Sequence, residues 1–103
     1  MKELRKAEIQ QIKRSLPIYQ LLKEWGIEPV RKVGNKLIYY SPFRNEAHPS
    51  FVVYDKQEYQ DWFDFGTNEG GDIIDLTMKF WGISYGEAVK LLRKRLNLEL
   101  AID

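Results

Sequence analysis

SPFRNEAHPSF, residues Ser41 to Phe51, is the stretch on which the fold assignment of this chain depends. Its prolines and polar residues mark a loop. Its spacing is that of the first half of a metal-binding knuckle, although it contains no cysteine. The segments on either side show which elements this loop connects.

Two β-hairpins flank the loop. Before it, residues 30–33 and 36–40 carry β-branched and aromatic side chains and are separated by Gly34-Asn35, a common turn pair. After it, residues 50–54 and 58–65 have the same composition and are separated by the polar residues 55–57. The pattern predicts an antiparallel meander of about four strands.

Helical patterns precede and follow the strands. Apolar residues at helical spacing over residues 18–25 predict a helix, with Ser15 as a candidate cap, Pro17 in the first turn and Gly26 as the stop. Residues 1–14 form either a short extra helix or an arm. Asp72 is expected to cap a second helix over residues 73–81, one side of which carries most of its apolar residues.

Ser84 and Glu87 predict a capping box for a last helix. Its expected apolar face consists of Ala88, Leu91, Leu92 and Arg95. Residues 66–72 are interpreted as a glycine-rich loop, and residues 97–103 as a last strand or a loose end. The predicted fold class is α+β: an antiparallel sheet of about four to five strands, an N-terminal helix and two C-terminal helices, in a single domain over residues 1–103.

Composition limits the function classes. The absence of cysteine excludes disulfides and thiolate metal sites. Residues 1–44 carry ten Lys and Arg against four acids, whereas residues 45–75 carry one Lys against eight acids. The basic part either faces a polyanion or pairs with the acidic part. We expect a cytoplasmic protein without a membrane contact, because the N-terminus is charged and no apolar run approaches the ~20 residues of a span.

The ordered motifs resemble the N-terminal zinc-binding domain of bacterial DnaG-type DNA primases. That family carries Cys-Pro-Phe-His-x-Glu-x-x-Pro-Ser-Phe where this chain has residues 41–51, and Cys-Phe-Gly-Cys-Gly where it has residues 62–66. A glycine loop, slightly longer than usual, and an apolar helix follow, and residues 87–92 fit the closing helix. The resemblance covers residues 18–92 and implies a zinc-ribbon type of fold.

The same comparison places Ser41, Arg44, Trp62 and Phe65 at the four zinc-ligand positions. A structural zinc needs four nitrogen or sulfur donors in a tetrahedral array, which these side chains do not supply. His48 is the single histidine. We therefore expect no cofactor and no zinc, as in the degenerate zinc fingers of phage and mobile-element members of the family.

An aromatic plug is the expected replacement for the metal. Trp62 and Phe65 would pack against Phe43, and Arg44 would stack over Trp62. Such a plug would hold the two loops together by burial of apolar area.

The resemblance implies a role in template recognition. In the primases, the zinc domain binds single-stranded template and helps to choose where primers start, whereas polymerase chemistry belongs to a separate toprim domain. We expect no enzyme activity from this chain alone. Asp61 and Asp64 would point to opposite faces of a strand, and Asp72 and Asp75 suit a helix start.

Candidate DNA contacts combine cations for phosphates with aromatic rings for base stacking. They are Arg31, Lys32, Lys36, Tyr40, Arg44, Tyr54 and Lys56. About two of the tyrosines at positions 39, 40, 54 and 59 are expected to be accessible. The alternative is a protein-docking module without DNA affinity that recruits a helicase or a toprim-domain polymerase, and the acidic residues 45–75 favour that interpretation.

Overall fold

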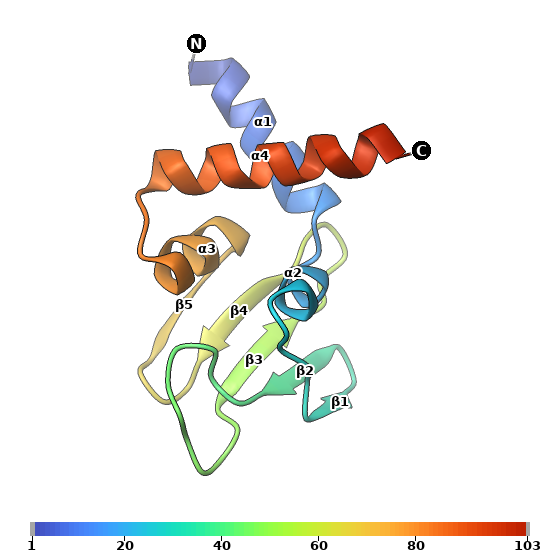
Figure 1. Ribbon diagram of the computed structural model, residues 1–103. Coiled ribbons are helices and arrows are strands. Elements are labelled where there is room, and N and C mark those ends of the chain that lie inside the picture. Colours follow the sequence, from blue (N-terminus) through green and yellow to red (C-terminus); the bar gives the residue numbers. More distant parts are fainter. Residues whose placement is uncertain (1, 103) are drawn as a thin grey trace.

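The computed structural model describes the backbone of residues 2–102 and the side chains of residues 5–97. It contains a five-stranded antiparallel sheet with two helices before it in the chain and two after it (Figure 1). The strands are β1 (Arg31–Val33), β2 (Lys36–Tyr39), β3 (Phe51–Tyr54), β4 (Asp61–Asp64) and β5 (Glu69–Gly71). The helices are α1 (Lys2–Ser15), α2 (Ile18–Glu24), α3 (Ile73–Trp81) and α4 (Tyr85–Ile102).

The sheet is a meander in which each strand pairs with the next one in sequence. Gly34 makes the β1–β2 turn with φ of +60°, a left-handed conformation that glycine adopts without steric cost. Neighbouring residues on a strand point to opposite faces, and directly paired residues share a face. The face of Tyr39, Phe51, Val53 and Trp62 is called the inner face, and the opposite one the outer face.

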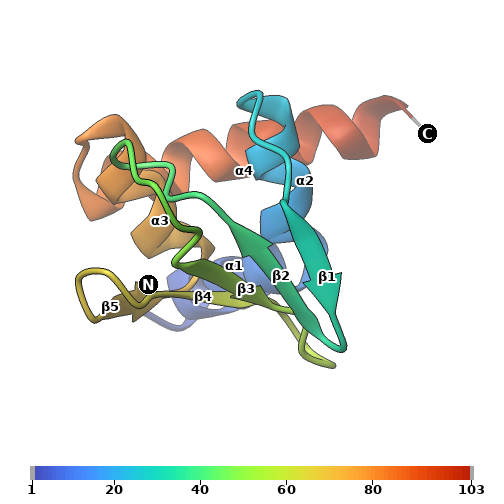
Figure 2. The same ribbon diagram turned by 90° about the horizontal axis from the view of Figure 1, so that it is seen from below.

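The hydrophobic core lies between the inner face and the helices. Figure 2 shows α2, α3 and α4 on one side of the sheet. Tyr39, Phe51, Val53 and Trp62 are all buried there, together with apolar residues from each of the four helices. Each fully buried large side chain contributes about 1.5 to 3 kcal/mol, so this single core accounts for most of the stability. No helix in the described part of the chain is long and apolar enough to cross a membrane.

The capping predictions for the two C-terminal helices are confirmed. The Asp72 side chain accepts hydrogen bonds from the backbone N–H groups of Ile74 and Asp75, and the Asp75 side chain accepts one from the Asp72 N–H, which completes a capping box. Ser84 and Glu87 form the expected reciprocal pair at the start of α4. These bonds satisfy N–H groups that a helix leaves without partners at its first turn.

The α+β class is confirmed, and several local predictions need correction. Residues 2–15 form helix α1, and Pro17 rather than Ser15 occupies the cap position of α2. The glycine-rich segment contains strand β5, because its backbone pairs with β4. The tail continues α4 as far as Ile102 instead of forming a strand.

The buried face of α4 also differs from the prediction. Ala88, Val89, Leu92 and Leu96 are buried, whereas Leu91 is 41% exposed. The predicted apolar face is rotated by about one residue relative to the buried one. It included the charged residue Arg95, whereas the packed helix buries Leu96.

Candidate nucleic-acid interface

The outer face of the sheet is open, and it gathers cations and aromatic rings. Cross-strand pairing places Arg31 opposite Ile38, and Lys36 opposite Val33 and Tyr54. Ile38 also pairs with Val52, which pairs with Phe63, so these side chains share one surface. The helices pack on the inner face, so nothing from α2, α3 or α4 covers this side (Figure 2).

Aromatic side chains on this face are accessible. Tyr40 is 48% exposed and Phe65 is 57% exposed. Phe63 and Tyr54 are half-buried, and the Phe63 ring meets the Phe65 ring edge-on at 4.8 Å between centroids. Rings that keep one face in solvent are the platforms on which single-strand binding proteins stack bases.

Two of the predicted cations, Arg31 and Lys36, lie beside these rings without an acidic partner. Both are exposed, and neither forms an ion pair with any described residue. The Lys36 Nζ lies 6.0 Å from the centroid of the Tyr54 ring. Charge that is not neutralised inside the protein remains available to a phosphate.

Lys32, Lys56 and Arg44 are placed differently. Lys32 is paired with Leu37, so it belongs to the opposite face of β1. The Lys56 Nζ forms an ion pair with Asp61 at 2.6 Å. The hydrogen bond that Lys56 donates to Asp61 raises the pKa of Lys56, which stays charged but is partly neutralised by the Asp61 carboxylate. Strand pairing therefore places Arg31, Lys36 and Tyr54 of the predicted set on the outer face, and Tyr40 follows directly after β2.

Arg44 is the centre of an internal polar network. Its Nη1 and Nη2 donate to the two carboxylate oxygens of Asp64 at 2.6 and 2.8 Å, in the bidentate geometry that favours arginine. Further donations reach Ser41 at 3.3 Å, Ser50 at 3.0 Å and Glu46 at 3.4 Å. Because the Asp64 side chain is fully buried, Arg44 is committed to holding residues 41–50 against β4.

The carboxyl groups of this network are stabilised in their ionised form. The hydrogen bond from Arg44 lowers the pKa of Asp64, and the backbone N–H groups of Gly66 and Thr67 assist against the effect of burial. Burial acts to raise the pKa of Glu46, but hydrogen bonds from Ser50 and the Ser41 backbone, with the charge of Arg44, outweigh it and lower that pKa. This network of Arg44, Asp64, Glu46, Ser41 and Ser50 is called the ionic clasp, and it joins residues 41–50 to the end of β4.

The aromatic plug exists only in part. Trp62 stacks on Phe51 at 5.4 Å and meets Phe43 edge-on at 5.7 Å, as the prediction for Trp62 and Phe43 required. Phe65 lies on the outer face, and Arg44 binds Asp64 instead of stacking over Trp62. The prediction was wrong for Phe65 and Arg44, because residues three apart on a strand point to opposite faces and because a buried carboxylate binds a guanidinium more strongly than a ring does.

Two outer-face residues, Phe63 and Phe65, were not among the predicted DNA contacts. Their signal was present in the sequence, since residues 63 and 65 alternate with Trp62 and Asp64 along β4. The same period places Asp61 and Asp64 on opposite faces, as expected.

Comparisons with known proteins identify the family of the chain. A family model described as CHC2 zinc finger matches residues 4–103. The chain belongs to the CHC2 zinc finger family. A DNA primase of Staphylococcus epidermidis is 33% identical to this CHC2 zinc finger chain over 94 residues, and one of Thermotoga maritima is 30% identical over 94 residues. Each alignment covers 91% of this chain, but only 15% and 16% of the respective relative.

A solved structure gives the same result for the fold. The crystal structure of the Aquifex aeolicus primase, comprising its zinc binding and RNA polymerase domains, superposes on the CHC2 zinc finger chain with a TM-score of 0.74 at 30% identity. The match covers 87% of this chain and 21% of that one. The chain therefore corresponds to a small part of its primase relatives.

The cofactor prediction needs correction. We expected no cofactor and no zinc, but the matching family is a zinc finger family, and the related Aquifex aeolicus structure is described as containing a zinc binding domain. The prediction rested on the side chains of Ser41, Arg44, Trp62 and Phe65 and on the single histidine, which concern the donor atoms of one chain and not the family to which it belongs.

The side chains expected at the four family ligand positions do not match a zinc site of the usual kind. Ser41, Arg44, Trp62 and Phe65 lack the thiolate and imidazole donors of a tetrahedral site. Within the described residues, no group of three or more His, Cys, Asp or Glu is arranged to hold a metal ion. The Arg44–Asp64 clasp joins the two loops at this place.

Proposed function

We propose that the outer face of the sheet binds single-stranded DNA and that the chain is a template-recognition module of a primase-like replication or mobilisation system in the cytoplasm. The observation that carries the proposal is the combination of two outer-face cations that form no ion pair with any described residue, Arg31 and Lys36, with the exposed rings of Phe65 and of Tyr40, which follows β2. The kinship with DNA primases supports it.

The physical basis is stacking together with charge. Each base that stacks on an aromatic side chain contributes roughly 1 to 3 kcal/mol, with little dependence on sequence. Each neutralised phosphate of a single strand adds a salt-dependent contribution. A face with several rings, and with two cations that no described acid neutralises, suits a short stretch of unpaired bases better than a duplex, whose bases are not accessible for stacking.

The chain is proposed to assist catalysis and not to perform it. The neighbouring carboxylates Asp72 and Asp75 cap the first turn of α3, which accounts for their proximity without a catalytic role. Primer synthesis would belong to a toprim-type polymerase or primase partner, to which this module presents the template.

Fluorescence anisotropy with a labelled single-stranded oligonucleotide at a series of salt concentrations tests the proposal. The Arg31→Ala, Lys36→Ala double variant should bind more weakly and reduce the slope of log K against log salt by roughly 1.4, about 0.7 per lost phosphate contact. Lys32→Ala is the matched control, because it removes a cation from the same strand on the opposite face. Equal losses for both variants, or no binding by the folded parent, would overturn the proposal.

A second candidate function is protein docking, favoured by an aromatic corner at the end of α3. Trp25 stacks on Phe80 at 4.4 Å, and Trp81 meets both rings edge-on while 51% of it stays exposed. Exposed tryptophans are frequent anchors of protein interfaces. This function would be favoured if the parent protein had no DNA affinity but bound a helicase or toprim polymerase, and if the Trp81→Ala variant lost that binding.

A further inference from the structure

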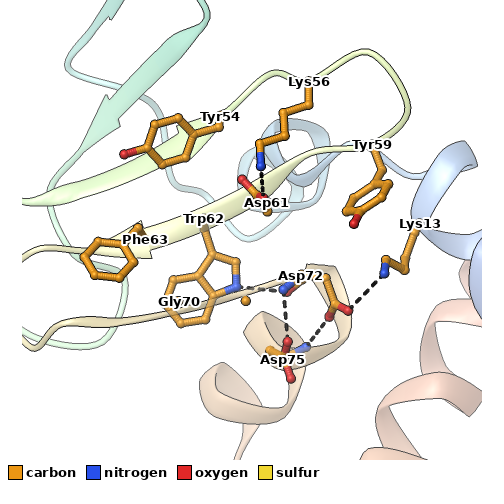
Figure 3. A pocket seen from close by; sticks show the side chains of 11 residues that line it. Lys13, Tyr54, Lys56, Tyr59, Asp61, Trp62, Phe63, Gly70, Asp72 and Asp75 are labelled. Atoms are coloured by element: carbon orange, nitrogen blue, oxygen red, sulfur yellow. Dashed lines mark hydrogen bonds and ion pairs between the residues drawn. The ribbon is translucent and has the colours of Figure 1, made fainter.

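A pocket opens beside the outer face, at the end of β5. Tyr54 and Phe63, which belong to the outer face, form part of its lining (Figure 3). On its other side lie Lys13 of α1 and the capping residues Asp72 and Asp75 of α3. Its volume of about 690 Å³ is in the range of small-molecule sites and leaves room for one nucleotide.

Two features make the pocket wall suitable for a flat ring. The wall contains the aromatic side chains of Tyr54, Tyr59, Trp62 and Phe63. Gly70 lies against Phe63 so closely that a Cβ at residue 70 would be 2.7 Å from the phenylalanine ring. The missing side chain allows Phe63 to lie over β5, with part of its ring still accessible.

The charges of the pocket do not favour a phosphate. Both lysines of the lining already have acidic partners: Lys56 binds Asp61 at 2.6 Å, and Lys13 lies 3.5 Å from Asp72. Lys13 also sits over the Tyr59 ring at 4.3 Å. With three carboxylates against two ammonium groups in the lining, a neutral ligand that donates hydrogen bonds fits better than an anion.

Asp75 provides the acceptor for such a donor. Its Oδ2 accepts from the Asp72 N–H at 3.0 Å, whereas its Oδ1 accepts no hydrogen bond from any described residue. Burial raises the pKa of Asp75, and the charge of Asp72 adds to that effect. The Oδ1 of Asp75, a residue of the pocket lining, therefore remains available to accept a hydrogen bond from a ligand.

We propose that this pocket holds one base of the bound single strand and prefers a base with an amino group, cytosine over thymine, through the carboxylate of Asp75. The inference rests on the proposed function, because the base enters from the outer face past Tyr54 and Phe63. The pyrimidine pair is decisive: cytosine presents an N4 amino donor where thymine presents the O4 acceptor. A carboxylate accepts from the amino group and is repelled by the carbonyl oxygen.

Anisotropy titrations with oligo-dC and oligo-dT of equal length, at one salt concentration and neutral pH, test the proposal. The parent should bind oligo-dC about tenfold more tightly, the effect expected of one hydrogen bond to a charged group. Asp75→Asn should abolish the preference while leaving oligo-dT affinity within about threefold of the parent. Glu58→Gln, which removes an exposed acid outside this pocket, is the matched control and should keep the preference.

Asp75 is also a capping residue, so a measurement on the parent protein complements the variant. Oligo-dC should shift the backbone amide resonances of Gly70, Gly71 and Asp75 in NMR spectra, and oligo-dT should leave them unchanged. Single-strand binding without a base preference, or a preference that survives in a folded Asp75→Asn variant, would overturn the proposed role of the pocket but not the proposed DNA binding by the outer face. No binding to either oligonucleotide by the folded parent would overturn both.

Discussion

Replacing Trp62 by alanine tests the different roles of Trp62 and Phe65, the two aromatic residues that were expected at family ligand positions. Trp62 is 4% exposed and lies at the centre of the inner face, stacked on Phe51 and edge-on to Phe43. Its indole N–H donates to the Asp72 carbonyl at 2.9 Å. Phe65 touches Phe63 and is 57% exposed. The two substitutions to alanine should therefore have very different costs.

The magnitude follows from burial. Truncation of a buried tryptophan or phenylalanine costs about 3 to 5 kcal/mol, and the indole hydrogen bond places Trp62→Ala near 4 kcal/mol. Domains of this size are typically stable by about 5 to 15 kcal/mol and lose roughly 4 to 8 °C in Tm per kcal/mol. Trp62→Ala should thus lower Tm by roughly 15 to 30 °C, whereas Phe65→Ala should stay within about 0.5 kcal/mol of the parent.

Urea denaturation followed by far-UV circular dichroism measures both changes without using tryptophan fluorescence as the signal. Trp62→Phe serves as an intermediate, since it keeps an aromatic ring but loses the hydrogen bond to Asp72. Its free energy of unfolding should fall between those of the parent and Trp62→Ala. Equal costs for Trp62→Ala and Phe65→Ala would refute the assignment of Trp62 to the core and Phe65 to the surface.

Three further perturbations test the packing and the ionic clasp. The pKa values of Asp64 and Glu46 are lowered from 3.8 and 4.5 in the folded protein, so the clasp stabilises the fold above those values and its contribution is lost as the pH falls through and below them. The urea concentration at the unfolding midpoint should therefore decrease as the pH is lowered below about 5. An Asp64→Asn variant whose midpoint decreases equally steeply with pH would contradict this. Tyr39→Phe should keep or raise stability by up to about 1 kcal/mol, because the buried hydroxyl has no hydrogen-bond partner among the described residues, and a clear loss in thermal denaturation would show otherwise. Gly82→Ala should cost about 1 kcal/mol in the same assay, since the residue ends α3 with φ of +65°, and an unchanged Tm would exclude that strain.

Local patterns were sufficient to predict most of the elements. Gly34-Asn35 defined the first turn, and Asp72 and Ser84 marked the starts of α3 and α4, because turn and capping chemistry depends on residues close in sequence. Strand β5 was missed because glycine has no side chain from which to read a strand pattern. Its pairing with β4 is made by the backbone alone.

The candidate site was less predictable, because it depends on partners distant in sequence. Arg44 was expected to contact DNA, but its partner Asp64 lies twenty positions along the chain and a buried carboxylate could not be inferred from local spacing. Phe65 is a different case. The alternation that separates Asp61 from Asp64 also separates Trp62 from Phe65, so the strand period would have placed Phe65 on the outer face.

The central claim, that the outer face of the sheet recognises single-stranded DNA, is tested most directly by titrating the isotopically labelled protein with a short single strand and following its backbone amide resonances by NMR. The account predicts that the perturbed amides cluster at Arg31, Lys36, Tyr40 and Phe65, with those of α2 and α4 unchanged. Perturbations confined to the helices, or no perturbation while the spectrum shows a folded protein, would contradict it.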